Sequence, residues 1–148
     1  MIREAKTEDI PKIVLLKLEM FKAAEMEHKL HDDFVEKAEK TYQELYHTGK
    51  AKHFLLEKDD EIIACAGAFI KEDIPYCFYK DPQYGFIGDV FVETTYRRNG
   101  YGRLLTNCAI DWLLKMEIKT IRLLASENAK KLYQELGFQG TDEMVLYR

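Results

Sequence analysis

The chain has 148 residues, of which 47% are hydrophobic and 32% charged, and its formal net charge at pH 7 is −4. These values are ordinary for a globular protein, and we expect one domain over residues 1–148. The acidic balance argues against nucleic acid as a partner, because binding to phosphate backbones needs a basic face. No apolar run approaches the ~20 residues of a membrane-spanning helix, and the first residues carry no signal-peptide pattern. We therefore expect a cytoplasmic protein without a membrane partner.

The first half of the chain predicts a strand, two helices and a hairpin. Thr7 followed by acidic residues is a typical helix start, and Gly49 is a typical helix stop. Runs of β-branched, aromatic and other apolar residues on both sides of a polar turn predict the hairpin. The segments are a strand over 1–6, a helix from Thr7 to about Lys29, a helix from Asp32 to His47, and strands at 53–57 and 61–70 around the turn 58–60.

The second half predicts alternating strands and helices after an irregular loop over 71–84. Gly88, inside the first of these strands, predicts a β-bulge or a close backbone approach. The segments are a strand at 85–92, a helix at 100–116, a strand at 120–125, a helix at 128–136 and a final strand at 144–148. This order predicts an α/β or α+β fold in which helices cover a sheet, while the strand order stays open.

The cysteines and histidines argue against a metal site. Cys65, Cys77 and Cys108 lie far apart, without the paired spacing of a zinc site or of a disulfide framework. His28 and His31 are the only close pair of histidines, and such a pair seldom has the further ligands that a site requires. We therefore expect reduced thiols and no bound metal.

The most informative stretch joins the predicted strand at 85–92 to the predicted helix at 100–116. It reads Arg97-Arg98-Asn99-Gly100-Tyr101-Gly102, so two glycines stand where a strand turns into a helix. Without Cβ atoms there, the first N–H groups of the helix can point at a phosphate, and the helix dipole favours its negative charge. Arg97, Arg98 and Arg103 add positive charge. The pattern predicts an anion site, although a tight connection also explains a lone Gly-x-Gly.

This stretch matches neither of two common phosphate loops. The Walker pattern needs Gly-Lys followed by Ser or Thr, and the dinucleotide fingerprint needs a third glycine where this chain has Leu105. Instead, Arg97-x-x-Gly100-x-Gly102 after a strand ending in Val92 resembles the acetyl-coenzyme A pyrophosphate loop of the GNAT superfamily of N-acetyltransferases. Residues 129–138, Ala-Lys-Lys-Leu-Tyr-Gln-Glu-Leu-Gly-Phe, resemble a second block of that family, Ala-x-x-Leu-Tyr-x-x-x-Gly-Phe.

The resemblance implies both a fold and an activity. The fold is a mixed, mostly antiparallel sheet flanked by about four helices and splayed open between the strand ending at Val92 and the strand ending at Ala125. The activity is direct transfer of the acetyl group of acetyl-coenzyme A, as co-substrate, to a primary amine of a small molecule or peptide. The alternative, from another class, is a non-catalytic module that binds or senses acyl-coenzyme A.

The resemblance also implies roles for individual residues. The N–H of Val90 stabilises the oxyanion, and Tyr133 protonates the departing thiolate. Ordinary core packing is the alternative, because Tyr133 belongs to an apolar helical face. The family often has Asn seven residues before this tyrosine, where the chain has Ser126, which equally suits a helix cap. The residues expected to contact the coenzyme are Val90, Phe91, Val92, Arg97, Arg98, Asn99, Gly100, Tyr101, Gly102, Arg103, Ser126 and Asn128.

The general base is left open. Some relatives carry a glutamate where this chain has Phe86, and the nearest carboxylates, Asp89 and Glu93, could act through water. If Asp89 lies in the cleft, we expect its pKa to be raised.

The acceptor is also left open. Four acids near the junction of the first two helices agree with a cationic amine, or are simply a solvated face: Glu25, Glu27, Asp32 and Asp33. Four aromatic residues of the loop at 71–84 line a pocket, pack the loop or join two copies in a homodimer: Tyr76, Phe78, Tyr79 and Tyr84.

Overall fold

The computed structural model describes residues 1–75, 77 and 81–148. Within this part of the chain the central element is a five-stranded sheet with the strand order β1-β2-β3-β4-β5. The first four strands pair antiparallel with their neighbours, and β5 pairs parallel with β4. The strands are β1 (Ile2–Glu4), β2 (Ala51–Lys58), β3 (Glu61–Glu72), β4 (Gln83–Val92) and β5 (Ile121–Leu123). The expected mixed, mostly antiparallel sheet is confirmed.

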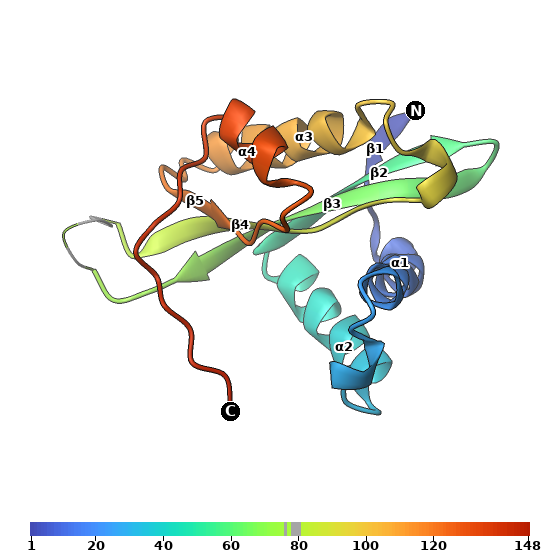
Figure 1. Ribbon diagram of the computed structural model, residues 1–148, viewed down its shortest axis with the longest axis horizontal. Coiled ribbons are helices and arrows are strands. Elements are labelled where there is room, and N and C mark those ends of the chain that lie inside the picture. Colours follow the sequence, from blue (N-terminus) through green and yellow to red (C-terminus); the bar gives the residue numbers. More distant parts are fainter. Residues whose placement is uncertain (76, 78–80) are drawn as a thin grey trace.

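Helices cover both faces of this sheet (Figure 1). The helices α1 (Ile10–Ala23) and α2 (Phe34–His47) lie on one face. The helices α3 (Tyr101–Lys115) and α4 (Lys130–Glu135) lie on the other face, with α4 over the end formed by β4 and β5. The fold therefore has three layers, and the two helix layers approach β4 from opposite sides.

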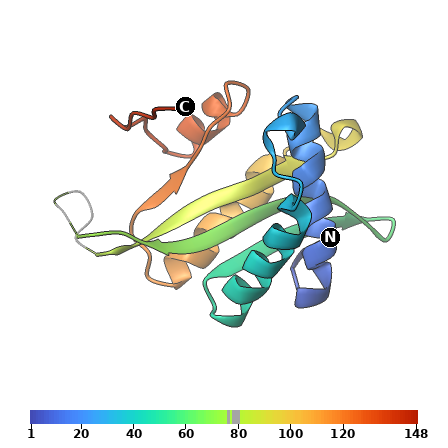
Figure 2. The same ribbon diagram turned by 90° about the horizontal axis from the view of Figure 1, so that it is seen from below.

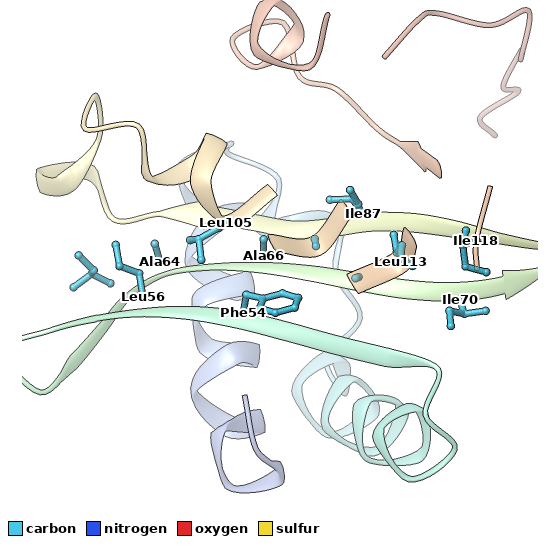
Figure 3. Packing of buried hydrophobic residues seen from close by; sticks show 12 residues of the cluster. Phe54, Leu56, Ala64, Ala66, Ile70, Ile87, Leu105, Leu113 and Ile118 are labelled. Carbon is cyan, nitrogen blue, oxygen red and sulfur yellow. The ribbon is translucent and has the colours of Figure 1, made fainter. Parts of the chain in front are cut away.

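Each face of the sheet has its own apolar cluster. Leu105, Ala109 and Leu113 of α3 recur every four residues, are fully buried and pack against β2, β3 and β4 (Figure 3). On the other face, apolar residues of α1 pack against Leu55 of β2 and Phe91 of β4. Burial of one such leucine stabilises a fold by about 1.5–3 kcal/mol, so these two clusters hold the layers on the sheet.

The first helix ends earlier than the sequence suggests. It stops at Ala23, and a separate 3₁₀ turn follows at Glu27–Lys29. Glu25 has φ 56°, and the N–H of Met26 donates to the carbonyl of Phe21, which is the hydrogen bond of a Schellman cap. A glycine usually marks that position. Because glutamate occupies it here, the predicted end at about Lys29 is wrong.

The predicted strand at 144–148 is also wrong. Residues 139–148 form neither helix nor strand, and Met144 is 94% exposed. A strand needs a partner to satisfy its backbone groups. The C-terminal segment instead lies clear of the sheet (Figure 2).

Candidate active site

The strand β4 contains a β-bulge. Gly67 of β3 pairs with Gly88 and Cys65 pairs with Phe91, so one residue of β3 stands opposite both Asp89 and Val90. The bulge that Gly88 predicted therefore lies immediately after it. Asp89 has φ 55°, in the left-handed region that a non-glycine residue adopts only when its surroundings hold it there.

Beyond the bulge, β4 has an open edge. The pairing of β4 with β5 begins at Gly85 and Ile121 and ends at Ile87 and Leu123, whereas β4 continues to Val92. The two strands then diverge (Figure 2), which confirms the expected splayed sheet. In the described part of the chain, no strand pairs with this side of the segment from Gly88 to Val92. An edge of this kind can pair with an extended ligand that presents amide groups.

The glycine turn starts α3 without a side-chain cap. Gly100 is the residue before the helix and has φ 78°, and its carbonyl accepts the hydrogen bond of Leu104 N–H at 3.1 Å. The N–H groups of the first turn of a helix have no acceptors within the helix. A Cβ on Gly100 would meet nothing within 4 Å, and one on Gly102 would meet only Val92 Cγ2 at 4.0 Å. The turn therefore leaves open space beside free amide donors, which suits a phosphate group.

The side chains of the turn brace it. The Nε of Arg97 donates to the carbonyl of Val92 at 3.0 Å, and its guanidinium lies 5.9 Å from the centre of the Phe91 ring. The Nδ2 of Asn99 donates to the carbonyl of Tyr96 at 2.9 Å. Arg103 forms an ion pair with Glu135. The first contact ties the turn to the open edge of β4, and the last ties α3 to α4.

Tyr133 lies on α4, two residues before Glu135, which is the ion-pair partner of Arg103. Its side chain is buried and meets Phe138 edge-on, with 6.0 Å between ring centres. Burial raises the pKa of the phenol, so Tyr133 is protonated at neutral pH. Among the described residues its hydroxyl has no hydrogen-bond partner. This state suits a proton donor and also suits plain packing.

Asp89 is the centre of a buried polar network on the α1 and α2 side of the sheet. Its Oδ1 accepts from Lys17 Nζ at 2.5 Å, and its Oδ2 accepts from Tyr42 OH at 2.5 Å. His53 Nε2 lies 2.9 Å from the same Oδ2, and Tyr46 OH lies 2.7 Å from His53 Nδ1. Elements α1, α2 and β2 thus converge on the one residue that starts the bulge.

This network sets the charge state of Asp89. Burial by itself would raise the pKa of the carboxyl, but the hydrogen bond from His53 and the positive charge of Lys17 hold this pKa well below its usual range. The expectation of a raised pKa is therefore wrong. With both oxygens occupied and the proton weakly held, Asp89 is a poor proton acceptor in this geometry.

Sequence reasoning missed Lys17, Tyr42 and His53. One signal was present for Lys17, because it continues the buried face of α1 defined by Ile10 and Val14, where a lysine needs a buried acid as partner. Gly67 is a second signal: a Cβ there would lie 2.8 Å from His53 Nε2, so only glycine leaves room for the imidazole.

The remaining predicted residues lie apart from this network. Ser126 and Asn128 are exposed between β5 and α4. The carbonyl of Ser126 accepts the N–H of Lys130, but no side chain caps α4, so the capping role of Ser126 is not observed. Tyr84 lies under the guanidinium of Arg122 at 5.0 Å, whereas residues 76 and 78–80 lie outside the described part of the chain.

The described residues show neither a metal-binding cluster nor a membrane-spanning helix. These residues contain no group of three or more His, Cys, Asp or Glu side chains placed to hold a metal ion. Among their helices, none has the length and apolar character needed to cross a bilayer.

Comparison with known proteins identifies the family. A model described as the acetyltransferase (GNAT) family matches residues 19–138. The chain therefore belongs to the GNAT acetyltransferase family. A search of curated proteins finds no significant match.

Solved structures share the fold. A predicted acetyltransferase from Clostridium acetobutylicum, solved with acetyl-coenzyme A, is 22% identical with a TM-score of 0.92, and the match covers 100% of this chain and 95% of that one. An aminoglycoside N-acetyltransferase in complex with coenzyme A is 18% identical with a TM-score of 0.77, covering 100% and 93%. Glucosamine-6-phosphate N-acetyltransferase from Arabidopsis thaliana is 18% identical with a TM-score of 0.75, covering 99% and 97%.

Proposed function

We propose that this chain transfers the acetyl group of acetyl-coenzyme A directly to a primary amine of a small molecule or peptide. The observation that carries the proposal is the position of the β4 bulge. The bulge lies just beyond the point where the pairing of β4 with β5 ends. The end of β4 is connected to the turn before α3 by the hydrogen bond from Arg97 to Val92. Membership of the GNAT family and similar structures solved with acetyl-coenzyme A or coenzyme A support it.

The residues present fit the coenzyme. The turn from Arg97 to Arg103 offers amide donors, open space and positive charge for a pyrophosphate. The edge formed by Val90, Phe91 and Val92 offers main-chain groups to the pantetheine amides. Bound acetyl-coenzyme A supplies the activated acetyl group. Ser126 and Asn128, in the loop before α4, are proposed as further contacts.

We assign the chemical steps to two groups of this chain. The N–H of Val90 hydrogen-bonds the oxygen of the thioester as negative charge develops on it, a contact worth about 3 kcal/mol in comparable sites. As the amine nitrogen bonds to the carbonyl carbon and loses a proton to solvent, the carbon–sulfur bond breaks. The hydroxyl of Tyr133 gives its proton to the departing sulfur and is reprotonated from solvent. Asp89 then has a positioning role: its carboxylate, held by Lys17, Tyr42 and His53, keeps the bulge in the conformation that presents the N–H of Val90.

The proposal is tested by release of free coenzyme A from acetyl-coenzyme A over a panel of amines. We expect amine-dependent release and detectable binding of acetyl-coenzyme A by calorimetry. Binding without amine-dependent release would instead support the non-catalytic module. If the natively folded protein bound no acetyl-coenzyme A, both functions would be excluded.

Replacement Gly102→Ala tests the anion site separately from folding. The added methyl group fits the fold, since a Cβ there meets only Val92 Cγ2 at 4.0 Å, but it occupies the space beside the free amides. We expect Kd for acetyl-coenzyme A to rise about fivefold, equivalent to about 1 kcal/mol, while stability is unchanged or slightly higher. Calorimetry and thermal unfolding measure the two quantities.

Gly140→Ala is the matched control for this prediction. Gly140 has nothing within 4 Å of an added Cβ, and it lies in the C-terminal segment, outside the turn at the start of α3. Equal affinity of the Gly102→Ala variant and the wild type would contradict the placement of a phosphate at the start of α3.

A further inference from the structure

A pocket lies between α1 and α2, on the face of the sheet opposite α3. Its volume is about 330 Å³, within the range of small-molecule sites. Lys17 and the buried Tyr42 form its inner end, and Phe34 and Ala38 add apolar surface. Exposed residues from the segment before α2 and from α2 form its mouth: Lys29, His31, Asp33 and Lys37.

The inner end of this pocket adjoins the polar network around Asp89, although no residue of β4 lines the pocket itself. Lys17 Nζ and Tyr42 OH each lie 2.5 Å from a carboxylate oxygen of Asp89, and Asp89 precedes Val90 in the bulge. A molecule in the pocket therefore approaches the bulge from the α1 and α2 side. The open edge of β4, facing the diverging β5, is left to the coenzyme.

The charges that line the pocket favour an anion. Three lysines line it, against Asp33 as the one lining carboxylate in the described part of the chain. Asp33 is paired with Lys37 at 3.0 Å, and from β4 the buried Asp89 is paired with Lys17. Among the described residues Lys29 has no such partner. The acids Glu25, Glu27 and Asp32, from which a cationic acceptor was one interpretation, do not line this pocket.

We infer that the acceptor is a small amine that also carries an anionic group, a carboxylate or a phosphate, and that it binds in this pocket. Lys29, His31 and Lys37 hold the anionic group at the mouth, and the amine points past Lys17 and Tyr42 toward Val90. This inference rests on the proposed function and adds to it the class of acceptor.

The test compares acceptors that differ only in the anionic group, at saturating acetyl-coenzyme A. The pairs are glucosamine 6-phosphate with glucosamine, and leucine with leucinamide, and spermidine serves as a polycation. In at least one pair, we expect kcat/KM to be at least tenfold higher for the acceptor with the anionic group than for the acceptor without it. The first pair reports on phosphate and the second on carboxylate.

A variant with Lys29→Gln and Lys37→Gln locates the effect. We expect its KM for the preferred anionic acceptor to rise about tenfold and its preference over glucosamine or leucinamide to fall, with the KM for acetyl-coenzyme A unchanged. Lys115→Gln, at the far end of α3, is the matched control for the loss of an exposed lysine.

The possible results separate the inference from the proposed function. Faster turnover of spermidine, glucosamine or leucinamide than of the anionic acceptors would overturn the inference. An unchanged preference for the anionic acceptor in the double variant would also overturn it. Neither result would contradict the proposed function. If no amine of the panel stimulated release of coenzyme A, the proposed function would fall and the inference with it.

Discussion

Tyr133→Phe is expected to lower kcat at least tenfold while the KM for acetyl-coenzyme A stays close to that of the wild type. The hydroxyl is the only group removed, and the remaining ring keeps its edge-on contact with Phe138. A proton donor acts on the sulfur only as the carbon–sulfur bond breaks, so its loss affects the transition state and not the binding of the ground state. Each factor of ten corresponds to about 1.4 kcal/mol.

Initial-rate kinetics on the purified variant measure this effect, and Tyr147→Phe is the control. Tyr147 is 87% exposed in the C-terminal segment, so the same chemical change there should leave kcat unaltered. Thermal unfolding of both variants checks that folding is intact. Wild-type kcat in the Tyr133→Phe variant would remove the hydroxyl from the mechanism and leave Tyr133 as a packing residue.

Much of this site is encoded in short stretches of sequence. Gly88 predicted an irregularity in β4, and the bulge begins at the next residue. Gly100 and Gly102 predicted a turn between a strand and a helix, and Gly100, with φ 78°, is the residue before α3. In the hairpin, Asp59 and Asp60 both have positive φ, as a two-residue turn between twisted strands requires. Each of these features depends on a few neighbouring residues, so local patterns are sufficient to predict it.

The polar network around Asp89 could not be predicted in the same way. Its three partners are separated from Asp89 by 72, 47 and 36 positions in the sequence, for Lys17, Tyr42 and His53 respectively. Their meeting depends on strand register and on how two helices pack on the sheet, and neither follows from periodicity. The failed strand at 144–148 has the same origin, because a short apolar run does not provide a neighbouring strand.

The network also explains why the chain tolerates a strained aspartate in β4. A non-glycine residue with φ 55° costs about 1 kcal/mol or more, and the surroundings must supply it. Here three side chains bind the carboxylate, and Cys65 Sγ donates to the carbonyl of Asp89 at 3.1 Å. Both the side chain and the main chain of Asp89 are therefore held in place, as preorganisation of the neighbouring Val90 N–H as a hydrogen-bond donor requires.

Asp89→Asn is expected to lower the free energy of unfolding by about 3 kcal/mol at pH 7, because the change leaves Lys17 without its buried partner. Asparagine adopts positive φ readily, so the variant removes the charge without forcing the bulge open. Because the pKa of Asp89 is depressed in the folded state, its contribution is complete above the ordinary aspartate value of about 3.9 and is lost as the pH falls further. The stability difference from the wild type should therefore narrow below about pH 4, which denaturant titrations at several pH values measure.

Kinetics of this variant distinguish a positioning role from a general base. A positioning role predicts a lower kcat with an unchanged pH profile, because the carboxylate is ionised throughout the assay range. A general base predicts instead that a limb of the profile disappears with the charge, and that result would reject the assignment made here. Combining Asp89→Asn with Lys17→Met should restore part of the stability lost in the single variant, since the unpaired ammonium group is removed. If the two single losses simply added, Lys17 and Asp89 would not act as a pair, and the anchoring of the bulge to α1 would have to be abandoned.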